Sequence, residues 1–237
     1  MLNIKIMKNI AITISLIISL SVNVFSQGYK DYKSVKLGLM ASPNLGWLRP
    51  ETRNFENEGV RFGISYGLIS DFRLADNYYV GSGVFLSHWS GKLLMPATEL
   101  INNVETDVTQ RRTYNLQYLE IPLTLKLLTN EVGYTTYYGQ FGLGLGANIN
   151  AKGTDRFYNN TYLRIDDDPD IKSDITFMRV GLVIGAGVEY SLAQNASVVI
   201  GLEYNNGFTN LLKAKPEHER KHSAITNYFQ ITLGIVF

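Results

Sequence analysis

The chain has 237 residues, enough for one large all-β domain or two small ones. Charged residues make up 18% of it, below the about 25% that is usual in soluble domains, and aromatic residues make up 12%. The absence of cysteine excludes disulfides, a lipidated cysteine and thiolate metal sites, and the net charge of +1 gives no reason to expect a nucleic-acid partner.

The N-terminus has the pattern of a secretory signal peptide. Lys5 and Lys8 precede an apolar run over residues 10–25, and Ser26 supplies a small residue at the expected cleavage point. The run is short for a membrane-spanning helix, and no later run has that length. We therefore expect residues 1–26 to direct export and residues 27–237 to form one domain. A retained signal anchor is the alternative.

Eight later segments alternate apolar and polar side chains with period two, which is typical of β-strands. They are predicted at Val35–Pro43, Val60–Arg73, Tyr78–Ser90, Thr113–Leu128, Tyr134–Ile149, Thr176–Leu192, Ala196–Phe208 and Ile225–Phe237. Most are long for soluble strands and match tilted transmembrane strands, which need about 9–11 residues.

The two faces of these strands differ in composition. One face is apolar, and the other carries glycine, small polar residues and sparse charges of both signs, which suits the interior of a narrow barrel with lipid outside. The charges predicted to face this lumen are Lys36, Arg61, Glu120, Lys126, Arg179, Glu189 and Glu203.

The stretch YLEIPLTLKL, residues 118–127, shows this alternation most clearly. Its leucines and isoleucine are predicted to face lipid, and Glu120 and Lys126 to face the lumen. Pro122 lacks a ladder donor, so we expect a bulge or a local bend there. Tyr118 shares the luminal phase with Tyr114 and Leu116, so a bulge is also an alternative for that segment.

The connections between the predicted strands alternate in length. Three are short, at Leu74–Asn77, Thr129–Gly133 and Ala193–Asn195, and four are long, at Asn44–Gly59, Gly91–Arg112, Asn150–Ile175 and Thr209–Ala224. Outer-membrane barrels have short periplasmic turns and long extracellular loops. The sequence therefore predicts an all-β fold, an eight-stranded antiparallel transmembrane β-barrel in the outer membrane, with aromatic girdles that include Trp47 and Trp89.

The motif YLEIPLTLKL also resembles the hallmark of the PorT-like outer-membrane β-barrel family of Bacteroidota. The stretches VRFGISYGLISDFRLADNYYVGSGVFLS, YYGQFGLGLGANI and GLVIGAGVEYSL are similar to other strands of that family. The terminal ITLGIVF, ending at Phe237, is similar to the signal that the barrel-assembly machinery reads. The resemblance implies an eight-stranded barrel of the Gram-negative envelope without established activity for most members, although PorT itself is implicated in type IX secretion.

Two loop motifs contain potential metal ligands. HERKH, residues 218–222, matches the zincin pattern H-E-x-x-H, but it lacks an apolar helical stripe and a third ligand, so a solvated loop is favoured. Residues 165–174 hold five aspartates without the EF-hand spacing, and a solvated loop is again favoured over a Ca²⁺ site. The glycine-rich stretches repeat every two residues and fit strands better than a phosphate cradle.

One pair of side chains suggests an enzyme. His88 and Ser90 share the outward face near the membrane rim, an arrangement similar to barrel lipid A deacylases, with Glu99 as the candidate carboxylate. The alternative is an ordinary strand end beside the Trp89 girdle, and the sequence favours it.

The sequence thus favours a structural or interaction barrel with no catalytic residue, cofactor or metal. A PorT-like component of a secretion or assembly complex is one alternative, and a lipid A hydrolase using His88 and Ser90 is another. A small-solute porin is disfavoured, because side chains fill an eight-stranded interior. The expected partners are outer-membrane lipid with lipopolysaccharide, the barrel-assembly machinery during biogenesis, and secretion-complex proteins under the first alternative.

Overall fold

The computed structural model describes residues 34–166, 170–193, 196–213 and 222–237. Residues 35–237 form one compact unit. The elements within it are β1 (Val35–Pro50), β2 (Glu56–Asn57), β3 (Arg61–Ala75), β4 (Tyr78–Ile101), β5 (Val104–Leu128), β6 (Thr135–Tyr158), β7 (Leu163–Asp166), the short 3-10 helix η1 (Lys172–Asp174), β8 (Met178–Ala193), β9 (Ala196–Gly207) and β10 (Ala224–Val236). Among the described residues, no helix is long and apolar enough to cross a membrane.

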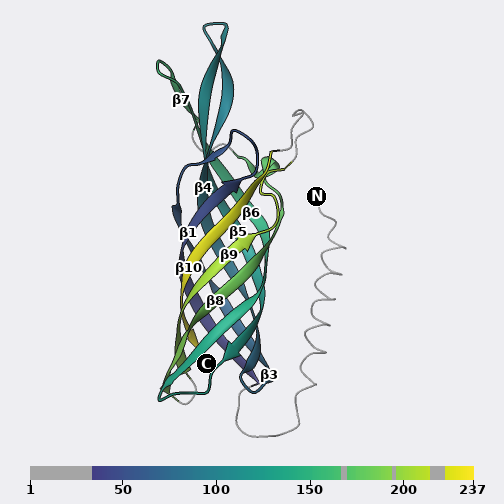
Figure 1. Ribbon diagram of the computed structural model, residues 1–237, viewed down its shortest axis with the longest axis vertical. Helices are drawn as coiled ribbons and strands as arrows, with labels where there is room; N and C mark the ends of the chain where they lie inside the picture. Colours follow the sequence, from purple (N-terminus) through teal and green to yellow (C-terminus); the bar gives the residue numbers. More distant parts are fainter. Residues whose placement is uncertain (1–33, 167–169, 194–195, 214–221) are drawn as a thin grey trace, which may run out of the picture. The chain divides into compact units, whose positions relative to one another are not determined.

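Eight of these strands close into an antiparallel barrel (Figure 1). Around the ring the order is β1, β10, β9, β8, β6, β5, β4 and β3, and β3 pairs again with β1. The predicted eight-stranded antiparallel barrel is therefore confirmed. Closure leaves each of these strands with a partner on both sides, which lipid requires because it offers no hydrogen bonds to a free edge. The short strands β2 and β7 pair with β4 and β6 outside this ring.

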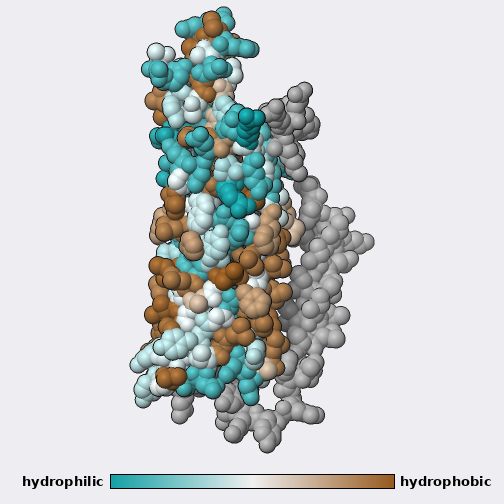
Figure 2. Space-filling model, viewed as in Figure 1, coloured by the Kyte–Doolittle hydropathy of each residue, from teal (hydrophilic) through white to brown (hydrophobic). Residues whose placement is uncertain are grey.

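The outer face of the barrel is apolar, as lipid contact requires. Leu119, Ile121 and Leu123 of β5 are exposed by 40%, 44% and 54%, and apolar side chains gather over the lower half of the molecule in Figure 2. Trp47 stacks on Tyr204 at the outer surface, with ring centroids 6.2 Å apart. Exposing such an apolar surface to water is unfavourable in free energy, so this surface fits the hydrocarbon core of a bilayer.

Two prolines lie inside strands of this closed sheet. Pro43 was expected to end the first strand, but β1 continues to Pro50, and the β1–β10 register is the same on both sides of an unpaired gap at Ser42 and Pro43. Pro122 was expected to cause a bulge or bend, yet the β4–β5 register is unchanged across a similar gap. Each proline lacks an N–H, so it interrupts one ladder without adding a residue to the strand.

The one register shift between β5 and β6 falls on β6. Gln117 pairs with Asn150 and Tyr118 pairs with Asn148, so Ile149 is the extra residue. The bulge that the sequence allowed in the segment up to Tyr118 therefore lies on the neighbouring strand. It turns both Asn148 and Ala151 inward, where they are 2% and 0% exposed.

The connection predicted as a loop at Gly91–Arg112 is instead a β-hairpin. β4 and β5 have 24 and 25 residues, whereas about 9–11 residues suffice to cross a bilayer. Asn102 and Asn103 form its two-residue turn with φ of 51° and 63°, as a type I′ turn requires. The hairpin projects well beyond the barrel beside β7 (Figure 1). Since the short turns lie at the other end, this end is the extracellular one.

Candidate functional site: the lumen and its extracellular mouth

The periplasmic end of the lumen holds a buried ion network. Lys126 Nζ lies 2.7 Å from Asp71 Oδ2 and 2.6 Å from Glu189 Oε1. Lys36 Nζ lies 2.8 Å from the other oxygen of Glu189. The Lys126 ammonium also stands 4.5 Å from the ring centroid of Tyr138. Two cations and two acids therefore neutralise one another across four strands, which cross-links the interior of the barrel.

A second network lies nearer the middle of the barrel. Glu120 accepts hydrogen bonds from Ser87 Oγ at 2.7 Å, Tyr228 OH at 3.1 Å and Arg179 Nη1 at 3.3 Å. Arg179 also donates through Nε to Thr226 Oγ1 at 2.7 Å. Both charged groups are thus satisfied by several partners, which a buried ion pair needs if desolvation is to be offset.

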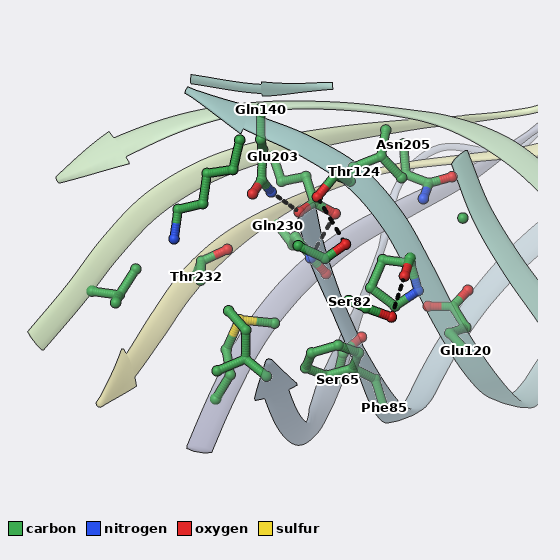
Figure 3. A pocket seen from close by; sticks show the side chains of 18 of the residues that line it. Ser65, Ser82, Phe85, Glu120, Thr124, Gln140, Glu203, Asn205, Gln230 and Thr232 are labelled. Carbon is green, nitrogen blue, oxygen red and sulfur yellow. Dashed lines mark hydrogen bonds between the residues drawn. The ribbon is translucent and has the colours of Figure 1, made fainter. Parts of the chain in front are cut away.

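Glu203 is bound differently from the other luminal acids. Its carboxylate accepts from Gln140 Nε2 and Gln230 Nε2, each at 2.9 Å, and Figure 3 shows the three side chains converging. The cavity beside them offers about 50 Å³ to the centres of water molecules. Since one water needs about 10–15 Å³ on this scale, the space is large enough for a few waters. Side chains fill most of the interior, as expected for eight strands.

An apolar layer lies between these networks and the extracellular end. Trp89 stacks on Tyr118 with ring centroids 5.5 Å apart, and the two side chains are 3% and 1% exposed. The buried members of this layer are Leu48, Trp89, Leu93, Tyr114, Leu116, Tyr118, Ala151, Ile171, Ile175, Leu211 and Ala224. Trp89, predicted for the membrane girdle, therefore faces inward, because the odd-numbered residues of β4 point into the barrel.

Above this layer, a cavity of about 460 Å³ opens to the outside between the extracellular loops, and we call it the mouth cavity. Its lining includes Phe55, Arg112, Tyr114, Lys213 and His222. Arg112 donates from Nε to Asp155 Oδ1 at 2.7 Å, and Tyr114 is buried. The mouth is thus amphiphilic, with aromatic, cationic and acidic groups.

The structure brings together most of the charges predicted for the lumen. Glu120 pairs with Arg179, Lys126 pairs with Glu189, and Glu203 lies between them. The prediction that Arg61 faces the lumen is wrong, because Arg61 is the first residue of β3 and its side chain is exposed. Asp71 was missed, although its phase on β3 places it inward with Ser65.

The remaining residues of the family-like motifs have structural positions. Pro122 lines the luminal cavity, and its carbonyl accepts from Ser82 Oγ at 3.0 Å. Phe237 pairs with Leu37 through backbone hydrogen bonds of 2.7 Å and 3.2 Å, and its side chain is 54% exposed. Residue 237 therefore extends the ladder between β1 and β10.

The side chains of the suggested hydrolase do not form a triad. Ser90 Oγ donates to Asn115 Oδ1 at 2.8 Å, and the ring of His88 stacks on Tyr66 at 5.9 Å. Glu99 lies on the projecting hairpin, where its Oε2 is 2.6 Å from Arg164 Nη1. The nucleophile, base and orienting acid that such chemistry needs are therefore not assembled.

The two metal motifs lie partly outside the described residues. Of HERKH only His222 is described, and its ring lies 4.9 Å from that of Phe55. Residues 167–169 of the aspartate-rich segment are likewise outside, and Asp174 lies 3.6 Å from Arg112. Within the described ranges, no group of three or more histidines and carboxylates could hold a metal ion.

The family model of the outer membrane protein beta-barrel domain matches residues 25–213. No curated protein matches the chain. Neisserial surface protein A is 9% identical, with a TM-score of 0.45 over 86% of this chain and 96% of its own. OprG from Pseudomonas aeruginosa is 10% identical, with a TM-score of 0.42 over 85% and 93%. The protease OmpT from Escherichia coli is 9% identical, with a TM-score of 0.36 over 90% and 99%. The chain belongs to the outer membrane protein beta-barrel domain family, and its location is the outer membrane.

Proposed function

We propose that this chain is a small outer-membrane barrel with an interaction role carried by its extracellular loops, and that it catalyses no reaction. The observation that carries this proposal is the β4–β5 hairpin, whose strands of 24 and 25 residues far exceed the membrane. Loops that project from a rigid scaffold are the usual place for binding residues.

The two projecting hairpins are joined by side chains, which supports a binding role for them. Arg164 of β7 pairs with Glu99 of β4 at 2.6 Å and with Asp166 at 2.7 Å. Its guanidinium also lies 4.6 Å from the ring centroid of Phe157 on β6. A hairpin held in place by such contacts loses less entropy on binding than a free loop.

Export and assembly belong to the same proposal. Residues 1–26 act as a signal peptide, and Phe237 with its preceding strand is recognised by the barrel-assembly machinery. Lipid and lipopolysaccharide then surround the apolar wall formed by β1, β3–β6 and β8–β10.

A component of a type IX secretion or envelope assembly complex is the second candidate, because YLEIPLTLKL resembles the PorT-like motif. In the structure the side chains of Tyr118 and Glu120 are buried in the lumen. These two side chains therefore support the barrel interior, and a partner would contact the outward-facing residues of the motif, such as Leu119 and Leu123, or residues elsewhere.

The test removes the hairpin and keeps the barrel. A variant in which a two-residue turn replaces residues 96–109 should still show heat-modifiable migration, because the deleted residues lie outside the membrane. Native outer membrane is extracted in mild detergent, and the mass of the particle is measured for both chains. We expect the wild-type particle to contain partners that the variant lacks. A wild-type particle of one folded chain, or identical partners for both chains, would overturn the interaction role.

A further inference from the structure

The strand register maps the outer wall of the barrel row by row over β4, β5 and β6. Leu86, Leu119 and Ala147 lie side by side, and the rows below them towards the periplasm are apolar apart from Ser82. The hydrocarbon core of the membrane therefore ends close to this row on this side of the barrel.

The next two rows towards the extracellular end consist of polar side chains. The first is His88, Gln117 and Asn150, and the second is Ser90, Asn115 and Lys152. Each row stands about 7 Å further along the strands. These side chains are amides, a hydroxyl, an imidazole and an ammonium, so they donate and accept hydrogen bonds as sugar hydroxyls do.

These two rows line a groove of about 570 Å³ on the outer wall. Its other side is formed by β3, where Phe62 and Ile64 are 69% and 42% exposed. The groove is therefore amphiphilic and opens directly above the apolar band. A molecule with acyl chains below and a polyhydroxyl headgroup above would match both parts.

Cations stand above the groove on the same face. Lys92 lies in the third row, and Arg111 and Arg156 lie next to each other in the fourth. The acids beside this face are Glu56, which lies opposite Leu94, and Glu58, which pairs with Arg111 and lies 4.0 Å from Lys92. Asp170 lies opposite Lys152 in a backbone β-bridge. Arg111 is thus already paired with an acid, whereas the exposed Arg156 has no acid partner among the described residues and can receive an anion.

We propose that this face, made of the four rows on β4, β5 and β6, binds the phosphorylated sugar headgroup of an outer-leaflet glycolipid. The inference rests on the proposed outer-membrane function and locates a lipid site on it. Acyl chains pack on Leu86 and Leu119, sugars occupy the groove, and phosphates contact Arg156 and Lys92. The headgroup region of a phospholipid is about 5–8 Å deep. The four rows extend about 20 Å along the strands, which is about 15 Å along the membrane normal for strands tilted by about 40°, and this favours a glycolipid.

The test uses the full chain in detergent and a rough lipopolysaccharide with phosphorylated lipid A and core as the probe. Lys92→Gln combined with Arg156→Gln removes two cations from the face. Arg53→Gln combined with Lys213→Gln removes two cations from the mouth cavity and serves as the matched control. Heat-modifiable migration shows that each variant is folded.

We expect the Lys92 and Arg156 variant to bind the probe roughly 30-fold more weakly, as two cations near an anionic surface imply, and the control to bind as the wild type does. Dephosphorylated lipopolysaccharide should lose affinity for the wild type by a similar factor. Equal losses in both variants, or no loss in either, would overturn the site. Full displacement of the probe by millimolar inorganic phosphate would assign it to free phosphate and overturn the lipid. Fractionation tests the proposed function separately, because the variants should reach the outer membrane normally.

Discussion

Lys126 should be the most costly cation to remove from the lumen. Its ammonium serves Asp71 and Glu189 at 2.7 Å and 2.6 Å, and all three side chains are at most 4% exposed. In Lys126→Met, Glu189 keeps Lys36, but Asp71 loses its one described hydrogen bond. Removing one partner of a buried ion pair costs about 3–5 kcal/mol. We expect a decrease of this size in the free energy of unfolding.

The assay is urea unfolding in lipid vesicles, followed by tryptophan fluorescence and by heat-modifiable migration. Lys36→Met is the matched control, since Lys36 is 23% exposed and its partner Glu189 keeps Lys126. An ion pair of this exposure contributes about 0–1 kcal/mol. Adding Asp71→Asn to Lys126→Met should restore part of the lost stability, because the unpaired buried charge is then gone. If Lys126→Met costs no more than Lys36→Met, water screens the network and the reasoning is refuted.

Three further predictions concern packing, closure and the hairpin turn. Gly142→Ala places a Cβ against the Leu123 carbonyl and 2.6 Å from Thr124 Cα, so it should lower the free energy of unfolding in urea by about 1–3 kcal/mol. Gly139→Ala should be neutral, because no atom lies within 4 Å of the added Cβ, and equal effects of the two substitutions would contradict the close approach of β5 and β6. Trp89→Ala removes the ring stacked on Tyr118, yet conductance in planar bilayers should stay at the wild-type level, because the networks of Lys126 and Glu120 still fill the lumen. A raised conductance would contradict a filled interior. Asn102→Val forces a β-branched residue into a φ of 51°, which costs about 1–2 kcal/mol, so a protease should cut the hairpin faster than in the wild type. Thr106→Val is the control, and equal cutting rates in the two variants would contradict the type I′ turn.

The fold could be predicted because the barrel obeys a local rule. On β5, Glu120 and Lys126 follow the period-two alternation without interruption, and so do the outward-facing Ile121, Leu123 and Leu125 between them. The same phase places Asp71 inward, so the missed acid had a signal on β3. The alternation tells which face of a strand a side chain is on, but not whether the strand end lies beyond the buried part of the lumen. The prediction for Arg61 was wrong for this reason.

The predicted strand ends and loops depended on signals that tertiary structure overrode. Pro43 and Pro122 read as interruptions, but a closed barrel retains the register because the flanking residues stay paired on both sides. The hairpin beyond Gly91 has weak alternation and reads as a loop. Its pairing depends on the Asn102–Asn103 turn and on contacts with β2 and β6, which no local pattern reveals.

The residues that form the extracellular layer could not be assembled from sequence. Trp89 and Tyr118 lie on neighbouring strands, and their stacking follows from the register of β4 against β5. Leu211 and Ile175 join the layer from loops, whose paths no alternation rule describes. The sequence therefore predicted the barrel and its luminal charges better than the closure of its mouth.

The most direct test of the transmembrane barrel measures which side of the outer membrane single introduced cysteines face, since the chain itself contains no cysteine. Thr106→Cys on the hairpin should react with a membrane-impermeant maleimide on intact cells. Glu131→Cys in the short β5–β6 turn should react only after the outer membrane is permeabilised, and Leu123→Cys on the lipid face should resist the reagent in both states. Labelling of Glu131→Cys but not Thr106→Cys on intact cells would reverse the topology, and ready labelling of Leu123→Cys in intact membranes would contradict the transmembrane barrel.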